Sequence, residues 1–358
     1  MKLPFVIAAS VGILLIFTDG VSAQKIFSEE SRIKYDTNYI QVYKDELTTR
    51  MFLSRKQTGY SLSDKYFTPR LAYNTNPNLL MGVGYTYSFL TLNLAVKLPF
   101  LNGDDDIYGE SKYIDLQSHT IFRSYILDFY LQWHKGFYVS NPDELFNGWE
   151  PGQPYPTRGD LRTNIVGVNI QYLFNSDRYS YKASFVQNEF QKRSAGSPIV
   201  GIESYWMLGM GDSLLIPGSI THLNILENYV PFNQVDMFNV GVNGGYAYTF
   251  VMKQRIYLSA SFIVGIAGGK SWFNYTPTSE TQFTGISLGL NNTSRISVGY
   301  NRNDFYIGMS YRRFSMSNLA DLNNGWIAYS TGNLRLNVVK RFKLKRSIKI
   351  LRPDLWIL

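Results

Sequence analysis

The chain has 358 residues, and its 35 Lys and Arg against 27 Asp and Glu give a formal charge of +8. Charged residues make up only 17% of the chain, whereas aromatic residues reach 16%. Only one long apolar stretch is present, whereas a polytopic helical membrane protein needs several, so this class is excluded. The absence of cysteine excludes a disulfide scaffold, a Cys-ligated metal and a cysteine nucleophile, and three histidines leave little room for a His-based metal centre. The sequence therefore predicts no metal ion and no other cofactor.

The N-terminus has the pattern of a cleaved secretory signal peptide. A short basic start is followed by an apolar run from Val6 to Phe17, too short to span a bilayer comfortably. Small residues then precede an expected cleavage between Ala23 and Gln24. Residues 1–23 are therefore predicted to be removed and the rest to be extracytoplasmic, which excludes nucleic acid as a partner. The positive charge is concentrated in a tail, residues 343–358, and the strand just before it.

After a lead segment at 24–44, predicted to contain no strand, apolar and polar residues alternate from about 45 to 342. This is the pattern of strands with two different faces, one apolar and one polar. In the segment 255–268, for example, Ile256, Leu258, Phe262, Val264 and Ile266 share one face. The expected strands are 47–55, 67–73, 79–87, 90–98, 112–122, 125–137, 162–174, 178–189, 198–210, 235–249, 255–267, 284–301, 305–315 and 329–342.

Three features favour an all-β, single antiparallel transmembrane barrel of about 12–14 strands over a soluble sandwich. The polar faces are rich in Gly, Ser, Asn and Thr, as a wet lumen allows. Aromatic residues such as Tyr300, Phe305 and Tyr311 stand near strand ends, where an interfacial girdle belongs. The last segment, 332–342, alternates and ends in Phe342, which is typical of the closing strand of outer-membrane barrels. We expect the outer membrane of a Gram-negative bacterium, with membrane lipid and the barrel-insertion machinery, which reads the closing strand, as partners.

The direction of the chain is not consistent through fourteen strands. The short turns at 123–124, 175–177, 250–254 and 302–304 should all be periplasmic, because such barrels keep their short turns on that side. Alternation through the fourteen segments cannot place all four there. Either one segment between 175 and 250 is not a strand, or the first two segments are not part of the wall. The long connections include 138–161, rich in Pro and Gly, and 211–234.

The chain resembles a family of outer-membrane proteins catalogued as domain of unknown function 4421. The resemblance extends over essentially all of the mature chain. The segments that carry it are Tyr35–Ile40, Leu47–Lys56, Tyr113–His119, Asn188–Ser197, Gly245–Phe250, Gly299–Tyr311 and Gly332–Phe342. It implies a Gram-negative outer-membrane barrel and brings no catalytic residues with it. The basic tail after Phe342 departs from a chain that ends at its closing aromatic residue.

One group of polar residues has the character of a site. The tight hairpin of 112–122 and 125–137 is predicted to pair His119 with Asp128, Gln117 with Tyr130 and Asp115 with Gln132. Lys97, on the preceding strand, is expected to approach Asp115. The whole group, predicted to line the lumen, is Lys97, Asp115, Gln117, His119, Asp128, Tyr130 and His134.

A His–carboxylate pair in a partly desolvated lumen suits a proton-linked site or a general base. The simpler reading is a charge-balanced network that stiffens or fills the barrel. Because Ser118 has the opposite parity to His119, no hydrolytic triad forms, and we assign no catalytic, cofactor or metal residues. The acidic stretch 104–106 is read as a solvated loop tip rather than a Ca²⁺ site, since its spacing is not that of an EF-hand.

Three functions follow from these features. A small-solute channel or transport barrel is favoured, a non-conducting structural or docking barrel is the alternative, and an enzyme is a remote third. The tail is expected either to contact lipid headgroups or a periplasmic partner, or to be solvated.

Overall fold

The computed structural model describes residues 35–43, 46–66, 70–87, 90–223, 225, 231–275, 281–283, 287–320 and 325–343. The expected signal peptide, its expected cleavage site and the tail beyond Lys343 lie outside these residues. The described strands are β1 (Ile40–Val42), β2 (Glu46–Asp64), β3 (Arg70–Asn74), β4 (Leu79–Tyr87), β5 (Leu90–Lys97), β6 (Lys112–Ile121), β7 (Tyr125–Val139), β8 (Thr157–Leu173), β9 (Glu189–Gln191), β10 (Ala195–Met210), β11 (Phe232–Met252), β12 (Ile256–Tyr275), β13 (Thr281–Phe283), β14 (Ser287–Asn301), β15 (Phe305–Ala320) and β16 (Gly325–Lys343). The short helical elements are η1 (Pro99–Leu101), α3 (Asp105–Tyr108), η2 (Pro142–Glu144), α4 (Tyr181–Phe185) and η3 (Gly218–Leu223).

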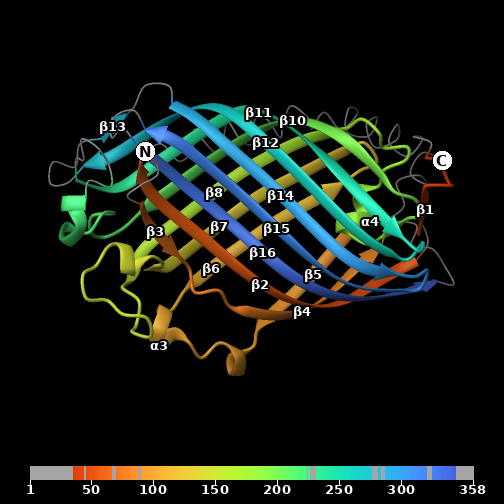
Figure 1. The fold of residues 1–358 in the computed structure, drawn as a ribbon, viewed down its shortest axis with the longest axis horizontal. Coiled ribbons are helices and arrows are strands. Elements are labelled where there is room, and N and C mark those ends of the chain that lie inside the picture. The colour runs from red at the N-terminus through yellow and green to blue at the C-terminus, as the bar shows by residue number, and fades with distance from the viewer. Residues whose placement is uncertain are drawn as a thin grey trace.

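The fold is a closed antiparallel barrel (Figure 1). Among the described strands, ten form the ring, in the order β2, β16, β15, β14, β12, β11, β10, β8, β7 and β3, and β3 returns to β2. The first and last long strands close it along their whole length, from the pair Glu46–Lys343 to the pair Asp64–Gly325. The main sheet contains fourteen described strands in all, so the expected number is right for the sheet but exceeds the ten of the closed ring.

The wall is completed differently at the two ends of β2. The short strand β3 joins β2 to β7 at one end only. Over its other half β2 pairs with β4, and β4 pairs with β5, whereas β7 pairs with β6. Within the described residues β5 and β6 are not paired with each other, so each presents one edge without a neighbouring strand.

The two ends of the barrel carry different connections. The short turns at 122–124, 253–255 and 302–304 lie at the end where β2 begins and β16 finishes, which we call the proximal end (Figure 1). The chain between β8 and β10 is at this end too. The longer connections 98–111 and 140–156, and the described residues 211–223 of the connection after β10, lie at the opposite, distal end. All four short turns expected on the periplasmic side therefore share the proximal end.

The expected strand at 178–189 is wrong, and this removes the conflict in chain direction. Ser180 caps a short helix instead, since its hydroxyl accepts a hydrogen bond (3.0 Å) from the Ala183 N–H. The helix, α4, buries Tyr181 and Ala183 two positions apart, which imitates the alternation of a strand. The lead segment is not wholly free of strand either, because Ile40–Val42 forms β1 and pairs with β9.

The outer face of the barrel is apolar only over its proximal half. On β11 this belt comprises Val240, Val242, Tyr246, Tyr248 and Phe250, all between 42% and 64% exposed. Toward the distal end, outward positions become polar, as at Gln57 of β2, Ser317 of β15 and Asp236 of β11. The belt has the composition of a lipid-facing surface, and the distal half of the wall extends beyond it. None of the described helices is long and apolar enough to cross a membrane.

The lumen is filled by side chains. Its distal half holds a large buried cluster to which many strands and the 211–225 segment contribute, including Tyr60, Tyr73, Phe137, Tyr205, Met207, Leu215, Ile220, Phe232, Phe273, Phe314 and Tyr329. A second buried cluster at the proximal end joins Ile126, Leu173 and Ile263 of the wall to Tyr179 and Tyr181 of the β8–β10 connection. Polar and charged side chains occupy the layer between the two clusters.

Candidate functional site

The hairpin of β6 and β7 has the register expected from the sequence. His119 lies opposite Asp128, Gln117 opposite Tyr130 and Asp115 opposite Gln132. The reason is the two-residue turn at 123–124, closed by a hydrogen bond from the Phe122 N–H to the Tyr125 carbonyl (2.8 Å), which fixes the pairing and so keeps the polar parity of both strands on the lumenal face.

Asp128 is the centre of the polar layer and is fully buried. One of its carboxylate oxygens lies 2.7 Å from Nδ1 of His119, and the other accepts a hydrogen bond from the guanidinium of Arg295. Arg295 comes from β14, five strands round the ring from β7, so this ion pair crosses the lumen. A buried carboxylate needs such partners, because desolvation of an unpaired charge costs several kcal/mol.

Arg312 of β15 completes the group from a third strand. Its guanidinium contacts Nε2 of His119 and the Tyr130 hydroxyl, and its centre lies 5.2 Å from the Tyr130 ring centroid. A guanidinium has no acceptor atom, so Nε2 of His119 must accept and Nδ1 must carry the proton that is donated to Asp128. His119 is thereby held as a neutral imidazole between a cation and an anion.

A second polar group joins β2 to the hairpin. The Lys56 ammonium lies 2.6 Å from the Asp115 carboxylate, and Nε2 of His134 lies 3.0 Å from the Thr58 hydroxyl. The expected approach of Lys97 to Asp115 is wrong. Lys97 pairs instead with Asp105 at the distal end, at 3.8 Å, because β5 is separated from β6 and its last residue reaches the 98–111 connection.

Amide side chains make further crossings of the lumen. Glu203 of β10 accepts hydrogen bonds from Asn243 (2.8 Å) and from Asn291 of β14 (2.7 Å). Asn239 of β11 and Asn318 of β15 bond each other through both amide groups. Asn243 lies on β11, the neighbour of β10, but the Glu203–Asn291 and Asn239–Asn318 contacts each join strands three apart in the wall. These two contacts therefore connect separate parts of the wall across the lumen rather than stabilising one pair of strands.

Sequence reasoning missed two members of this layer, Arg295 and Lys56. Arg295 shares the parity of Ser297 and Gly299, small residues typical of a polar lumenal face, so alternation identifies its face but not its partner. Arg55, by contrast, is exposed on the outer face. Its parity is that of Met51 and Leu53 in the lipid-facing belt, so the alternation itself gives the correct side.

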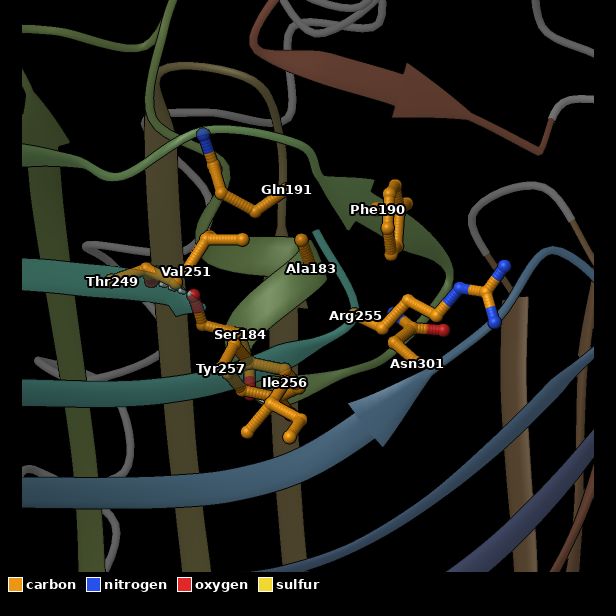
Figure 2. Close-up of a pocket in the computed structure, with 10 residues that line it drawn as sticks. All are labelled: Ala183, Ser184, Phe190, Gln191, Thr249, Val251, Arg255, Ile256, Tyr257 and Asn301. Carbon is orange, nitrogen blue, oxygen red and sulfur yellow. Dashed lines mark hydrogen bonds between the residues drawn. The ribbon is translucent and has the colours of Figure 1, made fainter. Parts of the chain in front are cut away.

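The proximal mouth is covered by α4 and β9. The Tyr181 hydroxyl donates to Ser261 (3.2 Å), and the ring of Tyr181 lies under the Arg295 guanidinium, 5.3 Å away. Figure 2 shows α4 against the wall, where Ser184 and Thr249 form a hydrogen bond of 2.7 Å. The hollow beside it has a volume of ≈ 10 Å³. That space suits one water molecule and no ligand.

The distal mouth is covered by the 211–225 segment. The Tyr73 hydroxyl donates to the carbonyl of Leu215 (2.9 Å), and Arg158 donates to the carbonyl of Leu214 (2.8 Å). Arg158 also donates twice to Asp160, which lies distal to the apolar belt of β8, and these bonds lower the pKa of the Asp160 carboxyl to about 2. The Asp212 N–H donates to the same carboxylate, at 3.0 Å.

The acidic stretch 104–106 shows no arrangement for a metal. Asp104 and Asp105 both accept hydrogen bonds from the Asn76 amide, at 3.2 and 2.9 Å, which fastens the 98–111 connection to the chain between β3 and β4. Across the described ranges, no three His, Cys, Asp or Glu side chains gather closely enough to hold an ion. The stretch acts structurally at its described positions rather than as a solvated tip.

Together these features define a transmembrane β-barrel whose lumen is crossed by ion pairs and amide bonds and covered at both mouths. The family model described as "Domain of unknown function (DUF4421)" matches residues 34–342. The chain belongs to this family, as its sequence resemblance indicated.

Comparison with solved structures finds distant likenesses to other barrels of the outer membrane. The translocator domain of autotransporter NalP from Neisseria meningitidis is 5% identical, with a TM-score of 0.31 over 82% of this chain and 88% of that one. OmpT of Vibrio cholerae is 9% identical, with a TM-score of 0.27 over 84% and 100%. The Pseudomonas putida toluene transporter TodX is 9% identical, with a TM-score of 0.22 over 83% and 90%. No curated protein matches the chain.

Proposed function

We propose that the protein is a non-conducting barrel of a Gram-negative outer membrane, which anchors and presents an ordered distal surface. The observation that carries this proposal is the filled lumen. The Asp128–Arg295 pair crosses the middle of the barrel, and buried clusters occupy the lumen on both sides of it. The alternative, a small-solute channel, requires a continuous wet path, and the burial of Asp128, Tyr130 and Arg295 in the polar layer argues against one.

The distal connections support a docking role because they fold together. Tyr108, Tyr138, Tyr155 and Trp149 form a chain of ring contacts with centroid distances of 5.0 to 5.2 Å. The Tyr155 N–H donates to the carbonyl of Ile107 (2.9 Å), which joins the 98–111 and 140–156 connections. Ordered loops bind a partner at a lower entropic cost than flexible ones do. An enzymatic role has no supporting arrangement of nucleophile and base in these residues.

The proposal is tested by planar-bilayer conductance of the purified, heat-modifiable mature protein. We expect the wild type to insert without discrete conductance steps. A porin reconstituted in parallel serves as the positive control, since its conductance steps show that insertion and detection work. Discrete, salt-dependent steps from the wild type at neutral pH would overturn the proposal and restore the channel.

A further inference from the structure

Three basic side chains stand in a row on the outer face of β6, β7 and β8. Lys112 is the cross-strand partner of Lys135, and Lys135 is the cross-strand partner of Arg162. All three are exposed and share the outward parity of their strands, since the lumenal side chains Tyr113, His134 and Thr163 alternate with them. We call Lys112, Lys135 and Arg162 the cation row.

Such a row is unfavourable by itself. Directly opposite side chains in an antiparallel sheet have Cβ atoms about 5 Å apart, and like charges there repel. Lys112 has a carboxylate nearby, Glu110 at 3.4 Å, but both groups are largely solvated. Neither Lys135 nor Arg162 has an acidic partner within the described residues, and Asp160, the next outward residue of β8, is bound to Arg158.

The row lies at the distal edge of the lipid-facing belt. Outward side chains of β7 run from Tyr125 through Leu127, Phe129 and Leu131 to Trp133, directly before Lys135. Lys135 is ten residues from Tyr125, and a strand rises about 3.4 Å per residue. With a strand tilt of about 45°, the two residues are roughly 24 Å apart along the membrane normal, close to the height of about 25 Å typical of an apolar barrel belt. Trp133 in the next row is the aromatic residue expected at an interface.

A local feature of β7 fixes the row in place. Gly136, with φ +86°, follows Lys135 and interrupts the register, so that the pairing resumes at Phe137 with Arg158. The hydroxyl of the buried Ser111, next to Lys112, donates to the Gly136 carbonyl (2.8 Å) and accepts from the Asn76 N–H (2.8 Å). The bulge therefore ends the regular pairing one residue beyond the cations and holds β6 against β7 at this level.

We propose that the cation row binds the phosphate groups of an anionic lipid in the leaflet at the distal end of the barrel. The lipid's acyl chains pack on Ile114, Leu116 and Leu131 beneath the row, where these side chains are 41–58% exposed. The guanidinium of Arg162 suits bidentate contact with phosphate, and the two lysines add point charges. With the short turns periplasmic, this leaflet is the outer one. The inference uses that orientation but does not depend on whether the lumen conducts.

The test is a titration of the full-length mature protein in neutral detergent with a phosphorylated lipid, lipid A, followed by native mass spectrometry. Lys135→Gln with Arg162→Gln is expected to weaken binding about 30-fold, since each cation near an anionic surface contributes about fivefold. Arg313→Gln is the matched control, because Arg313 is an outward cation next to the belt on β15 whose cross-strand partners, Ser294 and Gly332, are uncharged. It is expected to change binding by less than about fivefold. Heat-modifiable gel mobility shows that each variant is folded.

Three results would overturn the assignment. An equal loss in the Arg313→Gln control and in the double variant, taken per charge, would mean diffuse surface electrostatics rather than a site. Displacement of lipid A by millimolar inorganic phosphate would mean a free-phosphate site instead of a lipid site. Unchanged binding of lipid A in the folded double variant would remove the row from lipid recognition altogether.

Discussion

Replacement of Asp128 by Asn is the sharpest test of how the polar layer holds the barrel. Asp128 is fully buried and Arg295 is 3% exposed, so the substitution leaves a buried guanidinium without its counter-charge. Breaking a buried ion pair by removing one partner typically costs about 3–5 kcal/mol, because the remaining charge is desolvated and unpaired. We expect a loss of about 3 kcal/mol, near the lower limit, since the Asn amide oxygen still accepts one hydrogen bond.

The assay is urea unfolding of the protein in lipid vesicles, followed by tryptophan fluorescence. We expect the midpoint to fall while the slope m stays constant, because the surface exposed on unfolding does not change. Asp304→Asn is the control. Asp304 also pairs with a cation, Lys340 at 2.6 Å, but it lies in an exposed turn, where such pairs contribute little.

A double variant separates the pair from general damage. Asp128→Leu with Arg295→Met removes both charges and keeps the branched shape of the first side chain and most of the length of the second, so it is expected to be clearly more stable than Asp128→Asn alone. A loss below about 1 kcal/mol for Asp128→Asn would refute the reasoning. So would a double variant whose loss equals the sum of its two single losses, because independent effects mean that the two residues are not coupled.

Three further outcomes follow from local geometry. His119 should carry its proton on Nδ1, which ¹⁵N NMR can read because the chain has three histidines; an Nε2–H tautomer would contradict the placement of its partners. Because the pKa of Asp160 is lowered, its ion pair with Arg158 stabilises the protein above about pH 4, and this stabilisation is lost as the pH falls through about 2. Asp160→Asn should therefore speed limited proteolysis within 211–225 at neutral pH. An unchanged rate of proteolysis would count against the role of this ion pair. Gly136→Ala should lower the free energy of urea unfolding by more than about 2 kcal/mol, because φ is +86° and the added Cβ would lie 2.2 Å from the Glu110 carbonyl oxygen. Gly148→Ala is the control, and it should lower this free energy less, because Gly148 has the same φ but open space around it.

The alternation of apolar and polar residues identified the strands of the barrel wall, because lipid on one face and the lumen on the other impose opposite polarities on successive residues. The expected strand 79–87 coincides with β4, and the expected pairing of His119 with Asp128 is present. Both depend on local rules: a period of two, and a tight turn that fixes register. The strand expected at 178–189 shows the limit of this pattern, because a capped helical turn that packs against a lumen also buries residues two apart.

The contacts between side chains across the lumen could not be predicted from the alternation of apolar and polar residues. Parity assigns Arg295 and Arg312 to the inner face, but which strand stands opposite depends on the number of strands and on their stagger round the ring. Lys97 illustrates the consequence, since it was assigned to Asp115 on the assumption that β5 and β6 are neighbours. The break in pairing between these strands is a property of the whole wall, and no local pattern in 90–122 encodes it.

The closure of the barrel and the closure of its proximal mouth are connected through two buried arginines. Arg50 of β2 donates to the carbonyl of Val186 (3.2 Å), and Arg341 of β16 donates to the carbonyl of Gln187 (2.7 Å). These carbonyls stand at the C-terminal end of α4, where unpaired backbone acceptors and the helix dipole favour cations. β2 and β16 are the strands whose pairing closes the ring. Both guanidiniums therefore reach α4 together only after the wall has closed, so the covering of this mouth depends on the complete ring rather than on the 174–194 connection alone.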